Sequence, residues 1–304
     1  TLHNPLFPYT TLFRSMDERS ALGMLAGWVG GAGDDAAVID GLVLTTDMLH
    51  ERTDFPTGTT RYTAGWRAIG ASLSDVAAMG ASATAAVAAY GAPTFDPAEI
   101  EAFVDGASDV CEATGAAYVG GDLDNHDEFT VAGTVVGRTD DPVFRHGASP
   151  GDAVYVTGTL GRTGAAIREF ERGNADRGND LFQFDPRVAA GRRLAGVATA
   201  MMDSSDGLAR SLHQLAESSD CGFDVSWDRL PVDPSVDAVA ADDAERRELS
   251  TFFGEDFELV FTGPRATVEA MRDSVDTPIT RIGTVTDGDV LADGDPLPDR
   301  GYTH

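Results

Sequence analysis

Several segments of this chain place an aspartate against alanine, glycine, methionine or aliphatic residues instead of on a polar face. Asp34 follows a glycine-rich turn, Asp47 ends the run LVLTT, and Asp75 lies in a segment of small residues. Burying carboxylates without cations costs several kcal/mol each, so any fold of this chain must bring cations to them. Oxygen ligands with no histidine or cysteine nearby favour Mg²⁺, as several ions. The other aspartates in such settings are Asp122, Asp203 and Asp206.

The basic residues restrict the chemistry further. The formal net charge is −28, and all 22 basic residues are arginine. A uniformly acidic, lysine-free composition indicates a cytoplasm at high salt, where ions screen self-repulsion, and predicts a halophilic source. It disfavours nucleic acid and an anionic membrane as partners, because there is no basic patch to release counterions. The absence of lysine also excludes a GK[ST] phosphate loop, the protein-kinase lysine and a pyridoxal Schiff base.

Cysteine usage and hydropathy predict a cytoplasmic protein. Cys111 and Cys221 form neither a CxxC pair nor a disulfide framework, which favours core thiols in a reducing compartment. No apolar run reaches the roughly 18–20 residues that a membrane span needs.

The first residues are set apart from the rest of the chain. The run LFPYTTLFRS resembles the translation of a sequencing adapter, and it has neither signal-peptide organisation nor helical periodicity. We therefore expect residues 1–15 to be a non-native, adapter-derived segment, and we expect the natural start at Met16.

Apolar and periodic segments alternate along the chain in a pattern that predicts mixed helices and strands. The turn-rich stretch 139–151 predicts a boundary between an N-terminal domain, 16–140, and a C-terminal domain, 141–304. Both are expected to be of the α+β class. The predicted strands are 42–48, 82–90, 128–138, 152–158, 222–227, 257–262 and 279–286. The predicted helices are 61–81, 97–115, 162–172, 186–199, 206–219 and 265–275, with a polar loop over 171–185.

Several candidate side chains also have an ordinary structural explanation when each is taken alone. Asp206 precedes a helix and could be its N-cap, and Asp75 could be a helix-surface acid. Asp122 could be a turn residue, Thr45 an ordinary strand threonine, and Arg145 a surface arginine after a turn. The whole set, with apolar surroundings at every site, favours a metal cluster over separate coincidences.

The order of the motifs identifies a resemblance that covers the chain from Met16 onward. GAGDDAAV, LVLTTDM, ASLSDVAAMGA, VGGD, RHGASPGDAVYVTG, DSSDGL and GEDFELVFT occur in this order. The chain therefore resembles the thiamine-monophosphate kinases, which belong to the ATP-binding superfamily of aminoimidazole ribonucleotide synthetase. Any one of these motifs would be weak, but their combination is highly specific.

The resemblance implies a fold and a set of site residues. The fold is two α/β-sandwich-like α+β domains, with the N-terminal sheet pairing in a homodimer and the substrates between the domains. The N-terminal domain, 16–140, would bind ATP and Mg²⁺. By motif match, the metal ligands are Asp34, Thr45, Thr46, Asp47, Asp75, Asp122, Asp203 and Asp206. The ATP contacts are Gly121, Asp122, Arg145 and Ser205, and the contacts to the second substrate are Glu255 and Tyr302.

One position departs from the family pattern. The family often carries a histidine shortly after the TTD strand, where this chain has Asp54 in HERTDF. An aspartate there could approach the cationic thiazolium or the aminopyrimidine of the substrate. Asp54 is therefore an additional candidate for substrate binding.

The implied activity is ATP-dependent phosphorylation of thiamine monophosphate to thiamine diphosphate by Mg-assisted in-line phosphoryl transfer. The acceptor is a phosphate that is already ionised near pH 7, so no catalytic general base is expected. Two alternatives remain open. One is another enzyme of the superfamily, which would need a reactive cysteine that neither Cys111 nor Cys221 matches. The other is a non-catalytic protein that binds Mg-nucleotide or thiamine phosphate, and such a protein could lose Arg145 or Glu255.

Overall fold

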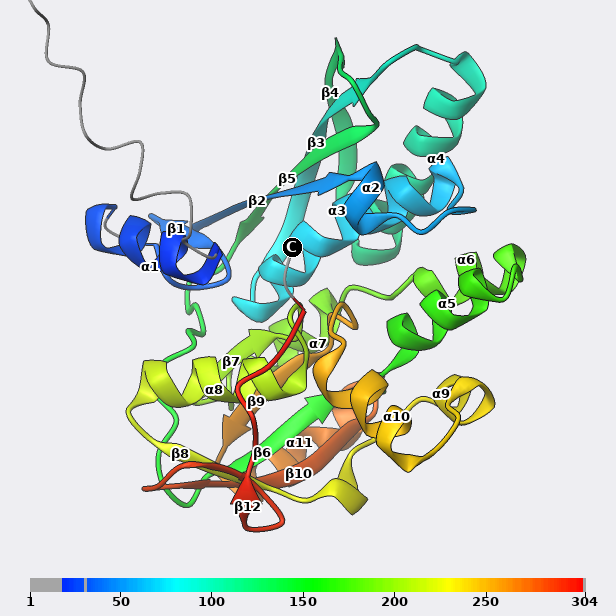
Figure 1. Ribbon diagram of the computed structural model, residues 1–304. Helices are drawn as coiled ribbons and strands as arrows, with labels where there is room; N and C mark the ends of the chain where they lie inside the picture. Colours follow the sequence, from blue (N-terminus) through cyan, green and yellow to red (C-terminus); the bar gives the residue numbers. More distant parts are fainter. Residues whose placement is uncertain (1–17, 30–31, 303–304) are drawn as a thin grey trace, which may run out of the picture.

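The chain folds into two halves, each built on its own sheet (Figure 1). The computed structural model describes residues 18–29 and 32–302; the expected adapter-derived segment 1–15 and the start at Met16 lie outside them. A five-stranded sheet occupies the first half and a seven-stranded sheet the second. Helices pack on both sheets, so the predicted α+β class is confirmed.

The N-terminal sheet has the strand order β1-β2-β5-β3-β4. All neighbouring strands are antiparallel except β3 and β4, which run parallel because α4 connects them. Helices α3 and α4 pack against each other and against this sheet. The elements of this half are α1 (Glu18–Trp28), β1 (Ala37–Ile39), β2 (Leu42–His50), α2 (Glu51–Asp54), α3 (Arg61–Ala78), β3 (Ser82–Ala92), α4 (Pro97–Thr114), β4 (Ala117–Asn125) and β5 (Thr130–Arg138).

The C-terminal sheet has the strand order β12-β11-β8-β10-β6-β9-β7, so its strands are far from sequential. Its interior strands β6 and β9 are buried along their whole length, as their apolar sequences require. The strands are β6 (Ala153–Thr157), β7 (Ala200–Asp203), β8 (Gly222–Val225), β9 (Leu259–Gly263), β10 (Ile279–Thr286), β11 (Val290–Ala292) and β12 (Asp295–Pro296). The helices are α5 (Arg162–Glu171), α6 (Ala175–Phe182), α7 (Val188–Leu194), α8 (Leu208–Ser219), α9 (Pro234–Val239), α10 (Asp243–Arg247), the π-helix η4 (Glu248–Phe252) and α11 (Arg265–Met271), with short 3₁₀ turns at Trp227–Arg229 and Arg272–Ser274.

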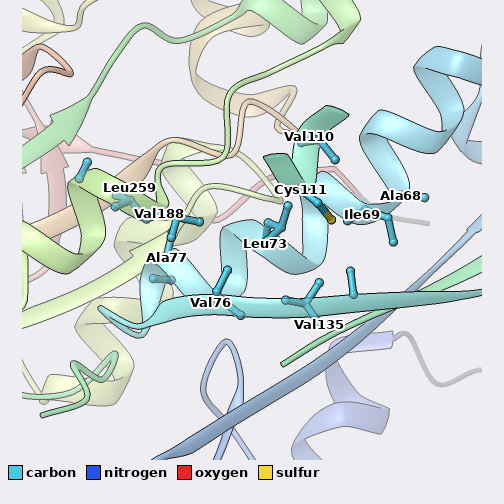
Figure 2. Close-up of a cluster of buried hydrophobic side chains, with 14 of the residues drawn as sticks. Ala68, Ile69, Leu73, Val76, Ala77, Val110, Cys111, Val135, Val188 and Leu259 are labelled. Atoms are coloured by element: carbon cyan, nitrogen blue, oxygen red, sulfur yellow. The ribbon is translucent and has the colours of Figure 1, made fainter. Parts of the chain in front are cut away.

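Helix α3 joins the two halves into one core. Figure 2 shows its apolar side chains between those of α4, β5, α7 and β9. Small residues permit this close packing on several sides. Gly65 of α3 and Gly106 of α4 face each other's helices: a Cβ on Gly65 would lie 2.1 Å from the carbonyl oxygen of Phe103, and one on Gly106 would lie 2.0 Å from that of Tyr62. The small-residue character of the predicted helix 61–81 therefore reflects a helix that is buried on nearly all sides.

The polar loop predicted over 171–185 is wrong, because this stretch contains helix α6. The charged composition of ERGNADRGND concealed an amphipathic helix whose Leu181 and Phe182 are buried. Asn179 fixes α6 to the first half, since its side chain accepts a hydrogen bond from Thr60 N and donates one to Gly58 O, both at 2.9 Å. The helix predicted over 186–199 is shorter than expected and ends at Leu194.

The glycine contact between α3 and α4 predicts a large loss of stability for Gly106→Ala. Alanine normally favours a helix interior by about 1 kcal/mol over glycine. Here the methyl group would meet backbone atoms that cannot move independently, so we expect a net destabilisation of about 2–3 kcal/mol. Urea unfolding in high KCl measures the free energy of unfolding of the variant and of the unchanged chain. The matched control is Gly196→Ala, which meets nothing within 4 Å; equal stability of the two variants would contradict the prediction.

Candidate active site

Three carboxylates from distant parts of the chain meet where the two halves join. Asp35 lies in the loop before β1, Asp75 in the last turns of α3, and Asp203 at the end of β7. One carboxylate oxygen from each lies within 4.8 Å of the other two. Within residues 18–29 and 32–302, this is the only such group of potential metal-binding side chains. We refer to Asp35, Asp75 and Asp203 as the carboxylate cluster.

The cluster is electrostatically suited to a cation. Burial raises the pKa of Asp75 well above its usual value, and the nearby charges of Asp47 and Asp203 raise it further. Burial has the same effect on the pKa of Asp203, with Asp35 the next cause. The Asp203 Oδ2 atom is buried and has no hydrogen-bond partner in the described part of the chain. Adjacent buried carboxylates with an unused oxygen fit a hard divalent ion such as Mg²⁺.

Arg145 contacts both members of the Asp34–Asp35 pair. Its backbone N–H donates to Asp34 Oδ1 at 2.8 Å, and its guanidinium donates from Nη2 to Asp35 Oδ1 at 2.9 Å and from Nε to Asp35 Oδ2 at 3.3 Å. The structure therefore directs Asp35 into the cluster and commits one oxygen of Asp34 to the backbone. Burial raises the pKa of Asp34. The sequence analysis named Asp34 of this pair as a metal ligand, whereas the structure places Asp35 in the cluster.

Strand β2 directs alternate side chains to opposite faces of the sheet, with Thr45 and Asp47 on one face and Thr46 on the other. Thr45 and Asp47 point toward α3, where the Thr45 hydroxyl donates to Asp75 Oδ2 at 2.5 Å and the Ser72 hydroxyl donates to Asp47 Oδ2 at 2.7 Å. Asp47 therefore lies beside the cluster, as its effect on the pKa of Asp75 also indicates. The Thr46 side chain is exposed and donates to a carbonyl of β5. Thr46 therefore points away from the cluster, and its role as a metal ligand stays a prediction.

The predicted ATP-contact positions Gly121 and Asp122 lie on the edge strand β4. A Cβ on Gly121 would lie 1.9 Å from the carbonyl oxygen of Ala88, so the parallel pairing of β3 and β4 requires glycine there. Asp122 is exposed, and its Oδ1 accepts the next backbone N–H at 3.0 Å. Neither residue contributes to the carboxylate cluster, and their roles stay predictions.

The three candidates for substrate binding lie together around Arg67. Glu255 Oε2 accepts from Arg67 Nη2 at 3.0 Å, and the Tyr302 hydroxyl donates to Thr53 O, next to Asp54, at 3.1 Å. Burial raises the pKa of Tyr302 to about 12, and the charges of Glu255 and Asp54 add to this effect. Asp54 is buried, and its Oδ2 accepts a backbone N–H at the start of α2 at 2.6 Å.

Backbone hydrogen bonds connect this group to the cluster. Ser205 and Asp206 lie two and three residues after Asp203, and their carbonyl oxygens accept from the backbone N–H groups of Glu255 at 2.6 Å and Tyr302 at 3.0 Å. The loop 203–206 therefore has the carboxylate cluster at one end and the predicted substrate residues at the other.

Arg67 is a site residue that the sequence interpretation did not single out. Its side chain is 3% exposed, its Nη1 donates to Phe182 O at 2.6 Å, and its guanidinium lies 3.6 Å from the Phe182 ring centroid. Burial lowers the pKa of Arg67, and the charge of Glu255 opposes this shift. The available signal was an arginine within a helix of small residues, where an unpaired charge would be costly.

A cavity of about 620 Å³ opens beside α2, within the size range of small-molecule sites. Its lining includes residues on both sides of Asp54 in the sequence, with both acidic and basic side chains. The lining residues are Glu51, Arg52, Phe55, Pro56, Thr57, Gly58, Thr59, Arg61 and Ala64.

Both halves of the chain match domains of one known class of proteins. Residues 33–139 match the N-terminal domain of the AIR synthase related proteins, and residues 149–293 match their C-terminal domain. The thiamine-monophosphate kinase of Halobacterium salinarum is 61% identical over 95% of this chain and 100% of its own length. That of Methanospirillum hungatei is 41% identical over 95% of this chain and 99% of its own length. The chain belongs to the thiamine-monophosphate kinase family.

A solved structure with bound ligands has the same fold. It is described as AaThiL complexed with AMPPCP and TMP, and it superimposes with a TM-score of 0.88 at 27% identity. The match covers 97% of this chain and 99% of that one. The two-domain architecture is therefore shared along the whole length.

The raised pKa of Asp75 predicts an unusual effect of Asp75→Asn. Because the folded-state pKa lies above the usual 3.8, the ionised carboxyl destabilises the metal-free fold increasingly as pH rises above that value. In EDTA and high KCl, we therefore expect the variant to melt at a higher temperature than the unchanged chain at pH 8. The difference should vanish as the pH approaches 4.

Thermal melting across a pH series, with and without Mg²⁺, provides the measurement. Mg²⁺ should stabilise the unchanged chain more than the variant, because an amide is a weaker ligand than a carboxylate. The matched control is Asp287→Asn, at an exposed position, which should behave as the unchanged chain throughout. A lower melting temperature for Asp75→Asn in EDTA at pH 8 would refute the electrostatic description of the cluster.

Proposed function

We propose that this chain transfers the γ-phosphoryl group of ATP to thiamine monophosphate, which yields thiamine diphosphate and ADP. The observation that carries the proposal is the carboxylate cluster, which both halves build beside Arg145 in a chain 61% identical to a thiamine-monophosphate kinase. Within the described residues the cluster offers only oxygen ligands, and the basic group beside it is an arginine. This combination suits phosphoryl transfer better than nucleophilic or redox chemistry.

The cluster would hold Mg²⁺, and the nearby carboxylates provide room for several ions. Asp35, Asp75 and Asp203 would be the central ligands, with Asp47 beside them. When bound, Mg²⁺ would neutralise the negative charge of the substrate phosphates. The further proposed ligands are Asp34, Thr45, Thr46, Asp122 and Asp206.

The chain's own residues would bind and orient two polyanions. Each pair of unit charges about 4 Å apart repels by roughly 4 kcal/mol at an effective dielectric constant of 20. Arg145 offers a planar fork that fits a phosphate, and it is 20% exposed, so a ligand can reach it. Gly121, Asp122 and Ser205 would complete the ATP site.

The acceptor would lie on the other side of the 203–206 loop. Glu255 and Asp54 place negative charge near Tyr302, which suits the cationic thiazolium of thiamine monophosphate. The acceptor phosphate is already ionised at neutral pH, so the residues around it need to position it and need not remove a proton.

We also propose a cytoplasmic location and a homodimer. In the described part of the chain, no helix is long and apolar enough to cross a membrane, and Cys111 and Cys221 are free thiols.

The N-terminal sheet exposes large apolar side chains on the face opposite α3. We call this the open sheet face and define it by Leu44, Met48, Val87 and Val119. Such a face suits a second copy of the same sheet, because a twofold axis pairs each apolar patch with itself.

Product formation tests the proposed activity. The chain is incubated with ATP, thiamine monophosphate and Mg²⁺ in high KCl, and thiamine diphosphate is measured by chromatography. We expect product that disappears with EDTA, and we expect Asp203→Asn and Asp47→Asn to lower kcat by about 100-fold or more, since each removes ligand charge. Asp287→Asn is the control. Turnover without divalent metal would refute the metal site, and nucleotide binding without product would indicate a non-catalytic protein.

The dimer proposal predicts that Val87→Asp produces a monomer. A carboxylate in an apolar interface must be buried without a partner, so association should weaken by several kcal/mol. Light scattering after gel filtration in high KCl measures the mass. Val104→Asp on α4 is a close control, because Val104 is 37% exposed and Val87 is 38% exposed. A monomeric unchanged chain, or equal masses for the two variants, would contradict the proposal.

A further inference from the structure

Residues Gly254–Phe257 connect η4 to β9 and carry Glu255, the proposed substrate-binding carboxylate. Three of these four residues have positive φ angles: +86° at Gly254, +58° at Glu255 and +54° at Phe257. The left-handed region is unfavourable for residues with a Cβ atom, so surrounding contacts must hold Glu255 and Phe257 there. We refer to residues 254–257 as the Glu255 segment.

Residues at the start of helix α5 form hydrogen bonds to one side of this segment. The backbone N–H groups of Gly161 and Thr163 donate to Asp256 Oδ2 at 2.5 Å and Asp256 Oδ1 at 3.0 Å. The Thr163 hydroxyl donates to the carbonyl oxygen of Glu255 at 2.7 Å. Thr163 and Asp256 are 1% and 7% exposed, so water cannot readily replace these bonds. Two consecutive residues of the segment are thus fixed from α5.

A second buried carboxylate anchors the segment where it enters β9. Glu258 accepts from Arg187 Nε at 2.7 Å and from the Thr157 hydroxyl at 2.6 Å. Its charge is therefore balanced by an arginine within the C-terminal half. Asp256 and Glu258 point into this half, whereas Glu255 and Phe257 point toward α3. The Phe257 ring stacks on the Phe184 ring, with their centroids 4.2 Å apart.

The opposite edge of the segment is bonded to the loop that leaves the carboxylate cluster. Glu255 N donates to Ser205 O at 2.6 Å, Phe257 N donates to Ser204 O at 3.2 Å, and Ser204 N donates to Glu258 O at 2.8 Å. The segment therefore lies between α5 and the residues directly after Asp203. A shift at α5 would move Glu255 relative to Arg67 and to the cluster.

We propose that Thr163 and Asp256 are positioning residues that hold Glu255 in its left-handed conformation, so that its carboxylate faces the acceptor substrate. This inference rests on the proposed kinase activity. The two residues act through Glu255, and neither belongs to the carboxylate cluster. Their loss should weaken the productive binding of thiamine monophosphate and leave ATP binding unchanged.

The test uses steady-state kinetics of Thr163→Val and Thr163→Ser. Valine keeps the branched shape and the backbone N–H that binds Asp256, but it removes the hydroxyl bond to Glu255; serine retains the hydroxyl. We expect Thr163→Val to raise KM for thiamine monophosphate about tenfold and to leave KM for ATP within about twofold of its original value. Thr163→Ser should keep the original KM for thiamine monophosphate. Asp256→Asn places an amide N–H against a backbone N–H donor, so it should also raise KM for thiamine monophosphate.

A double-mutant cycle with Glu255→Gln separates positioning from general stability. If Thr163 acts through Glu255, Thr163→Val should change KM little once Glu255 is already glutamine. Melting temperatures of all variants show whether each is folded under the assay conditions. Unchanged KM in folded Thr163→Val, or effects that simply add in the double variant, would overturn the inference while thiamine diphosphate formation by the unchanged chain still supports the proposed function. No product from the unchanged chain would overturn both.

Discussion

Repulsion among buried carboxylates is the constraint on which the rest of this structure depends. Asp35, Asp75 and Asp203 come from a loop, a helix and a strand, and their oxygens lie within 4.8 Å of one another. Like charges at this separation in a buried site oppose folding, and burial adds to the cost. Packing of the surrounding elements must therefore hold the three residues in place. Helix α3 supplies this packing, because it is in contact with the first sheet, α4, α7 and β7.

The composition of α3 explains how one helix can support the core and the site together. Its glycines and alanines allow close approach to α4 and β5, so little room is used by side chains. The few larger polar groups on α3 then point to defined partners. Arg67 meets Glu255, Ser72 meets Asp47, and Asp75 joins the cluster. The same helix thus orients the proposed acceptor site and the proposed metal site relative to each other.

The sequence predicted the α+β class and the apolar surroundings of the aspartates, because both depend on local patterns. It named Asp34 and not Asp35 as the metal ligand, because adjacent residues differ only in the direction that the turn gives them. That direction depends on Gly33, with φ of +118°, and on Arg145, more than a hundred residues away. Helix α6 was missed for a related reason: its polar sequence becomes helical through burial of Leu181 and Phe182 against other elements. Arg67 likewise acquires its role only from tertiary contacts.

In this lysine-free, highly acidic chain, arginines neutralise several buried carboxylates by forming ion pairs with them. Arg67, Arg145 and Arg187 each pair with a carboxylate, and two of these pairs use two guanidinium nitrogens, a geometry that lysine cannot offer. The Arg187–Glu258 pair anchors the Glu255 segment, so it serves structure. The Arg145–Asp35 pair is similarly exposed, with Arg145 at 20% and Arg187 at 19%, but it touches the cluster. These two charges can separate without penalty only if an anion reaches Arg145 while a cation reaches Asp35. A nucleotide that arrives together with Mg²⁺ satisfies both requirements at once, whereas either component alone leaves one buried charge without a partner.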